Sequence, residues 1–172
     1  MPAAYTPIAT QTLGSAAATV TFSSIPQTYT DLVLVTSVLS TSVSGWGINF
    51  NSDVTSGNYG YIVTDGQGSS VQTVRQTAPG RLQIGGWSIA TGSTTKPSIG
   101  ITNIFSYSNT TTNKTALSRS QTYNSTTGTN VSAFAGVWKN TAAITSIVVS
   151  LDSASYSFLA GSTFTLYGIK AA

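Results

Sequence analysis

The sequence contains no histidine, no cysteine and no glutamate, and its only acidic residues are four aspartates. Acid–base catalysis, thiol nucleophiles and zinc sites each depend on these residue types. A serine nucleophile would have only lysine or aspartate as its base, and no Gly-x-Ser-x-Gly motif occurs. We therefore expect a protein that is not an enzyme and that uses no cofactor.

The four aspartates could form a catalytic site only if folding brought two of them together, as in a glycoside-cleaving carboxylate pair. Each lies instead at an expected strand entry or turn, where aspartate commonly caps backbone amides. A structural role is the stronger interpretation for all of them. They are Asp31, Asp53, Asp65 and Asp152.

Charge of either sign is scarce, because only 6% of the residues are charged and the net charge is +3. The cations are scattered singly along the chain, whereas nucleic-acid binding needs them clustered on one face. The hydrophobic content of 40% argues against disorder. We expect a folded protein without a nucleic-acid partner.

Long apolar runs are also missing. No window approaches the roughly eighteen apolar residues of a membrane-spanning helix. Residues 1–20 have no basic segment, so they do not match a secretory signal. These patterns predict synthesis in the cytoplasm and no membrane partner.

Short β-strand patterns rich in Thr, Val, Ile and Tyr recur along the chain, separated by clusters of Gly, Ser, Asn and Thr. This spacing predicts an all-β, single-domain fold of ten to eleven strands, an antiparallel β-sandwich or a barrel. The expected strands are 19–22, 32–35, 46–50, 59–64, 71–75, 82–89, 98–107, 115–121, 131–138, 144–151 and 163–169.

Residues 1–18 show no convincing strand, and Pro2 and Pro7 restrict their backbone. We expect an extended N-terminal arm there, followed by the sandwich domain over residues 19–172.

Asn49, Asn51 and Asp53 are the best match to a metal site, because their alternate spacing places three oxygen-bearing side chains on one side of an extended segment. Against calcium, the group has a single full charge and no bidentate glutamate. The following Ser-Gly-Asn sequence is ordinary turn chemistry. We expect no bound metal, with these three residues as weak candidates.

The aromatic residues allow two interpretations. They could stack on sugar rings, as in a lectin, or fill the core of the sandwich, which is the commoner role. Trp138 has the opposite strand parity from Val131, Ala133, Ala135 and Val137, and this parity makes it the best candidate for an outward-facing aromatic residue.

Several stretches together resemble a group of small structural proteins of tailed bacteriophages, notably those of marine and cyanobacterial phages. They are packing and turn patterns without catalytic residues. The stretches are SIPQTYTDLVLV (24–35), NFNSD (49–53) with NY (58–59), SYSNTT (106–111) with KT (114–115), VWK (137–139) and AGSTFTLYGIK (160–170).

The resemblance implies an antiparallel β-sandwich with a jelly-roll-like arrangement that assembles into a virion. The leading expectation is a decoration or cement protein on the outer surface of the capsid, forming a homotrimer and contacting the major capsid protein or another virion protein. The alternative is a tail-fibre or receptor-binding module that recognises a host glycan.

Contacts with such partners are expected from the N-terminal arm, from loops and from outward aromatic residues. A proline-containing arm suits extended docking, because proline reduces the entropy lost on ordering. The candidate interface residues are Pro2, Tyr5, Pro7, Lys96, Asn109, Lys114, Tyr123 and Trp138.

Overall fold

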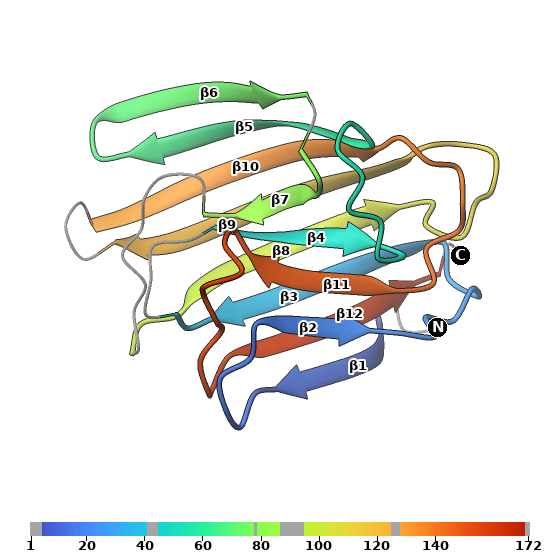
Figure 1. The fold of residues 1–172 in the computed structure, drawn as a ribbon, viewed down its shortest axis with the longest axis horizontal. Coiled ribbons are helices and arrows are strands. Elements are labelled where there is room, and N and C mark those ends of the chain that lie inside the picture. Colours follow the sequence, from blue (N-terminus) through green and yellow to red (C-terminus); the bar gives the residue numbers. More distant parts are fainter. Residues whose placement is uncertain (1–4, 41–44, 78, 87–94, 125–127, 171–172) are drawn as a thin grey trace.

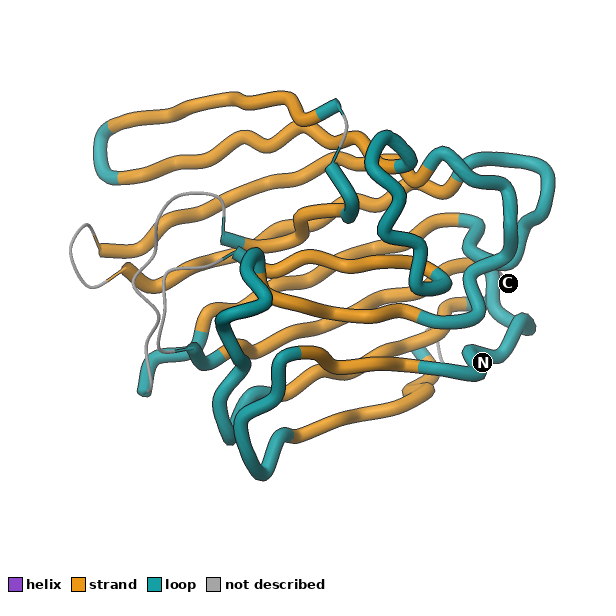
Figure 2. The backbone as a smooth tube through the Cα atoms, viewed as in Figure 1, coloured by secondary structure: helices purple, strands orange, loops and turns teal. Residues whose placement is uncertain are grey.

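The computed structural model describes residues 5–40, 45–77, 79–86, 95–124 and 128–170, and it contains only strands and loops in that part of the chain (Figure 1). Twelve strands form two antiparallel sheets. Loops connect the strands mainly at the two ends of the sheets (Figure 2). Within the described residues, no helix has the length and apolarity needed to cross a membrane.

The large sheet has eight strands, and the small sheet has four. In spatial order, the large sheet contains β1 (Thr6–Thr12), β12 (Thr163–Ile169), β3 (Asp31–Val38), β8 (Ser98–Phe105), β9 (Lys114–Asn124), β10 (Gly128–Trp138), β5 (Tyr59–Gln67) and β6 (Ser70–Gln76). The small sheet contains β2 (Thr19–Phe22), β11 (Ile147–Leu151), β4 (Trp46–Phe50) and β7 (Leu82–Gly85).

The small sheet lies against one face of the large sheet, called here the inner face (Figure 1). Its edge strand β7 packs against β8, β9, β10 and β5. The core forms between the two sheets, because strand alternation sends every second side chain inward. Leu32 and Leu34 of β3 meet Ile48 and Phe50 of β4 in this core.

The predicted sandwich is confirmed, and strands β2, β4 and β12 have the expected bounds. The jelly-roll arrangement is not confirmed, since a jelly roll has eight strands in two sheets and the described residues form twelve, divided eight and four. The expected strand 82–89 is seen as β7, which ends at Gly85; residues 87–89 lie outside the described residues.

The N-terminal segment corrects the expectation of an extended arm outside the sandwich domain. Residues Thr6–Thr12 form β1, which pairs with β12 at the edge of the large sheet, so the sandwich begins well before residue 19. The register shifts between Pro7 and Ala9, and an edge strand with a bulge is where proline is tolerated. Ile8, Ala9 and Leu13 pack against the core.

Deleting residues 1–12 should therefore destabilise the fold rather than only remove a contact arm. The deletion leaves the backbone of β12 unpaired on one side and uncovers apolar side chains, with an expected loss of about 2 kcal/mol or more in the free energy of unfolding. Urea denaturation of the deleted and full-length chains would measure it. A control that lacks only residues 1–4 keeps all of β1, and equal midpoints for the long deletion and this control would contradict the role of β1.

Candidate functional site

The metal candidates Asn49, Asn51 and Asp53 lie at the end of β4 and in the loop after it, where their side chains fasten loops together. Asn49 Nδ2 donates to the carbonyl oxygens of Asp53 at 2.8 Å and Gly80 at 2.6 Å. Asn51 has a φ of 52°, and its Oδ1 accepts the backbone amide of Thr145 at 2.8 Å. The described residues include no group of three or more acidic residues that could hold a metal ion.

Asp53 holds an aromatic residue in place. Its Oδ2 accepts hydrogen bonds from Trp138 Nε1 and from Asn58 Nδ2, both at 2.8 Å, and its Oδ1 accepts the amide of Thr55 at 2.9 Å. Burial alone would raise the pKa of Asp53, but these hydrogen bonds outweigh it and lower the pKa to about 2. The carboxylate is therefore an anchor for the core.

Trp138, the candidate for an outward-facing aromatic residue, instead fills the core, which is the commoner role of such residues. Trp138 is fully buried, 5.5 Å from Phe50 and 6.4 Å from Tyr59 between ring centroids. The parity argument separates the two faces of β10 correctly, but it assigns them the wrong way round. Val131 and Ala133, on the other parity, are the exposed residues.

Lys114 is likewise not a surface contact. Its side chain is fully buried, and Nζ donates to the carbonyl oxygens of Thr112 at 2.7 Å and Thr141 at 3.0 Å. Burial lowers the pKa of this lysine. Its charge ties the start of β9 to the segment before β11.

The other candidate interface residues have mixed environments. Exposed Lys96 lies 4.5 Å from the ring centroid of Tyr123, so the fold brings these two together. Asn109 is exposed, but its Oδ1 accepts the amides of Thr111 and Thr112 and so caps a turn. Tyr5 and Pro7 are exposed at the β1 edge, and Pro2 lies outside the described residues.

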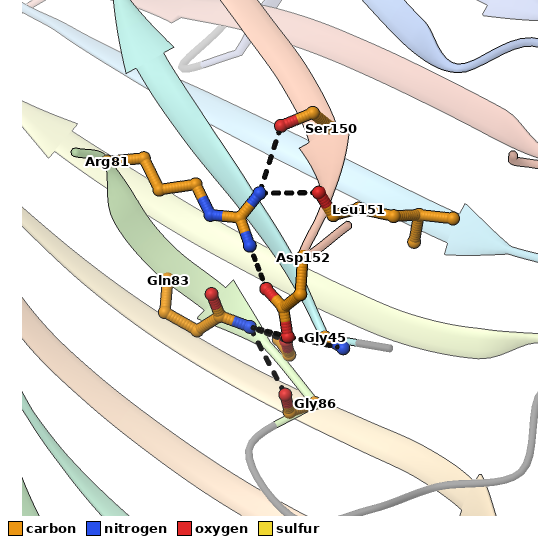
Figure 3. A network of polar contacts seen from close by, with 8 residues as sticks. Gly45, Arg81, Gln83, Gly86, Ser150, Leu151 and Asp152 are labelled. Atoms are coloured by element: carbon orange, nitrogen blue, oxygen red, sulfur yellow. Dashed lines mark hydrogen bonds and ion pairs between the residues drawn. The ribbon is translucent and has the colours of Figure 1, made fainter. Parts of the chain in front are cut away.

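A polar network joins the edge strand β7 to the end of β11 (Figure 3). Arg81 forms an ion pair with Asp152 and also donates to Ser150 Oγ at 3.1 Å. Asp152 Oδ2 accepts the amide of Gly45 at 2.8 Å. Beside this network is a polar cleft of about 550 Å³, lined also by Tyr61.

The four aspartates have separate structural partners and do not form a carboxylate pair. Asp31 accepts the amide of Ser106 at 2.7 Å, and Asp65 accepts the hydroxyl of Ser132. The other two hold Trp138 and Arg81. Three of them cap or anchor loops, as their positions predicted, but Asp65 lies within β5 and not at the expected turn, and it is buried there.

The face of the large sheet that points away from the small sheet carries exposed apolar side chains, and sequence reasoning missed it. Ile62 of β5, Leu117 of β9 and Val131 of β10 are 48%, 49% and 62% exposed. With Ala133 and Ala135 of β10 they form what we call the outer patch. The alternation of side chains along β9 and β10 shows which residues share a face. It predicts the outer patch only when it is known which of the two faces the small sheet covers.

Two adjoining hollows of about 540 and 480 Å³ lie in the outer patch, and both are lined by Ile62, Leu117 and Ala135. Arg75 borders the first hollow and Arg119 borders the second. Contiguous exposed apolar surface of this kind marks interaction sites in folded proteins. The outer patch is the candidate functional site.

Comparisons with known proteins found no family model, no curated protein and no solved structure that matches the chain.

Replacing Asp53 by Asn should lower the free energy of unfolding at neutral pH by about 2 kcal/mol, because the hydrogen bonds to Trp138 and Asn58 lose their charge. The folded-state pKa of Asp53 is about 2, below the ordinary aspartate value of 3.8. The ionised carboxylate of Asp53 therefore stabilises the folded state above pH 4, and this stabilisation is lost as the pH falls toward 2. Urea midpoints of both proteins should converge over that range.

The same substitution in a Trp138→Phe background provides the control, since phenylalanine has no indole N–H. The effect of Asp53→Asn should be smaller there. An equal effect in both backgrounds would show that the Trp138 hydrogen bond is not what Asp53 contributes.

Proposed function

We propose that this protein is a non-enzymatic structural protein of a virion, a capsid decoration or cement protein that docks on the assembled shell through its outer patch. The observation that carries the proposal is the exposed apolar surface around Ile62 and Leu117. Such side chains become stabilising when a partner removes them from water, by about 2 kcal/mol for each leucine-sized residue.

The shape of the outer patch suits a broad contact better than a small ligand. Both hollows are open depressions on the surface of a sheet, and small residues such as Ala133 and Ala135 let another backbone approach closely. A sheet surface is also rigid, so little conformational entropy is lost on binding. These properties favour docking on a large, repeated surface.

Docking of this kind is enough for a decoration protein. A protein that binds the assembled lattice better than its free subunits stabilises the lattice by mass action, without any chemical step. The scarcity of proton-transferring groups in the sequence agrees with such a role. The partners under this proposal are the major capsid protein or another virion protein.

A homotrimer remains part of the proposal, because capsid surfaces offer three-fold positions. The edge strand β1, with exposed Tyr5 and Pro7 nearby, provides a second surface that is separate from the outer patch. One protein could then use β1 for contacts between copies and the outer patch for the shell.

The alternative function is a glycan-binding module of a phage tail. An exposed tryptophan platform for sugar rings does not support it, since both Trp46 and the candidate Trp138 are buried. The polar cleft beside Arg81 and Asp152 supports it better, because Tyr61 and two side-chain amides, Asn49 and Gln83, line the same space. Glycan-array binding that is lost in Arg81→Ala would favour this alternative.

Replacing Leu117 by Asp should weaken binding to particles by at least tenfold, since burying an unpaired carboxylate adds to the loss of an apolar contact. Purified virions stripped of the protein would be incubated with recombinant chains, and bound protein would be measured by sedimentation. The matched control is Val54→Asp, because Val54 is an aliphatic residue that is 72% exposed in the β4–β5 loop.

Both variants should keep the unfolding midpoint of the parent, since both residues are exposed. Equal particle binding by the Leu117 and Val54 variants would refute docking through the outer patch, and failure of the parent chain to bind any particle would refute the decoration role.

A further inference from the structure

We infer that the partner of the outer patch is an acidic protein surface that combines apolar side chains with carboxylates, and that it is not a second copy of this chain. This inference rests on the docking role proposed above. It comes from the distribution of charge on the strands that carry the outer patch.

The neighbouring strands β8, β9, β10, β5 and β6 contain a single carboxylate, that of Asp65. Asp65 points to the inner face, is fully buried and accepts a hydrogen bond from Ser132. No carboxylate of these five strands therefore reaches the outer face.

Cations do reach that face. Arg119 is exposed and has the same strand parity as Leu117, and Arg75 is exposed and has the same parity as Val71. Exposed Lys139, just after β10, borders the first hollow together with Arg75. Each hollow thus has an aliphatic floor and a guanidinium group beside it.

Guanidinium groups at the border of an apolar contact favour carboxylates, because the planar group can donate two parallel hydrogen bonds to one carboxylate. A partner that places apolar side chains in the hollows and carboxylates beside Arg75 and Arg119 satisfies both features at once. Charge complementarity of this kind mainly sets specificity and the rate of association.

A second copy that presented the same face would fail this requirement. Its Arg75 and Arg119 would bring more positive charge, and the five strands would supply no carboxylate in return. Like charges brought together at an interface disfavour it. The outer patch therefore fits a different protein.

A pair of dyes tests the surface chemistry without any biological partner. Anilinonaphthalenesulfonate is an apolar anion, and N-phenylnaphthylamine is nearly the same molecule without the sulfonate. Arg119→Glu and Arg75→Glu should each weaken binding of the anionic dye on the order of tenfold, while binding of the neutral dye changes little. Leu117→Asp should weaken binding of both dyes.

The matched control is Lys170→Glu, which changes the net charge equally at an exposed cation that follows β12, away from the outer patch. It should leave the binding of both dyes unchanged. Equal effects of Lys170→Glu and Arg119→Glu on the anionic dye, or no dye binding by the parent chain, would overturn the inference.

Binding of the variants to the stripped virions then tests whether the partner surface is acidic. Arg119→Glu should weaken particle binding on the order of tenfold while Lys170→Glu does not, and added salt should weaken binding of the parent chain. Equal binding by the two variants would overturn the acidic partner and leave docking intact. Failure of the parent to bind particles would refute the decoration role, and the dye result would still stand.

Sedimentation of the parent chain alone tests whether a second copy of the chain is the partner of the outer patch. A dimer that Leu117→Asp converts to monomers would show that a second copy covers the outer patch, and it would overturn the inference.

Discussion

Two sheets of unequal width share one apolar core, and the rest of the structure depends on this. The four strands of the small sheet cover only the inner face of the large one, and no described strand covers the other face, where β5, β9 and β10 expose side chains to solvent. Antiparallel sheets tolerate such exposure when the outward side chains are polar. Here Ile62 and Leu117 face outward instead, and the outer patch is the result.

The carboxylates of the chain have partners within the fold, whereas its cations lie both inside the fold and on the surface. Asp53 holds Trp138, Asp152 holds Arg81 and Asp65 is fully buried, so the carboxylates contribute to the fold. Arg75 and Arg119 remain exposed on the outer face. A net charge of +3 therefore understates how strongly cations dominate the surface around the outer patch.

Sequence periodicity was sufficient to predict the fold class and most of the strands, because alternation records which side chains are buried. It missed β1, since Pro7 and a bulge hide the pattern of that edge strand. It also separated the two faces of β10 without assigning the covered one, and so the buried Trp138 was the best candidate for an outward aromatic residue. Which parity faces the core depends on where the small sheet lies, and that is a property of the tertiary structure.

The site residues were less predictable than the fold. A loop position indicated an exposed Lys114, but its ammonium group is buried and donates to the carbonyl oxygen of Thr141, 27 residues away in the sequence. The oxygens of Asn51 and Asp53 suggested a metal, whereas they accept hydrogen bonds from residues distant in the sequence. In both cases a deciding partner lies outside the local sequence window.

Electron cryo-microscopy of particles that carry the protein would test most directly whether the molecule acts through the uncovered face of its large sheet. We expect density in which the outer patch of β5, β9 and β10 abuts a neighbouring protein while the small sheet faces solvent. Density with the small sheet against the shell and the outer patch in solvent would contradict that claim.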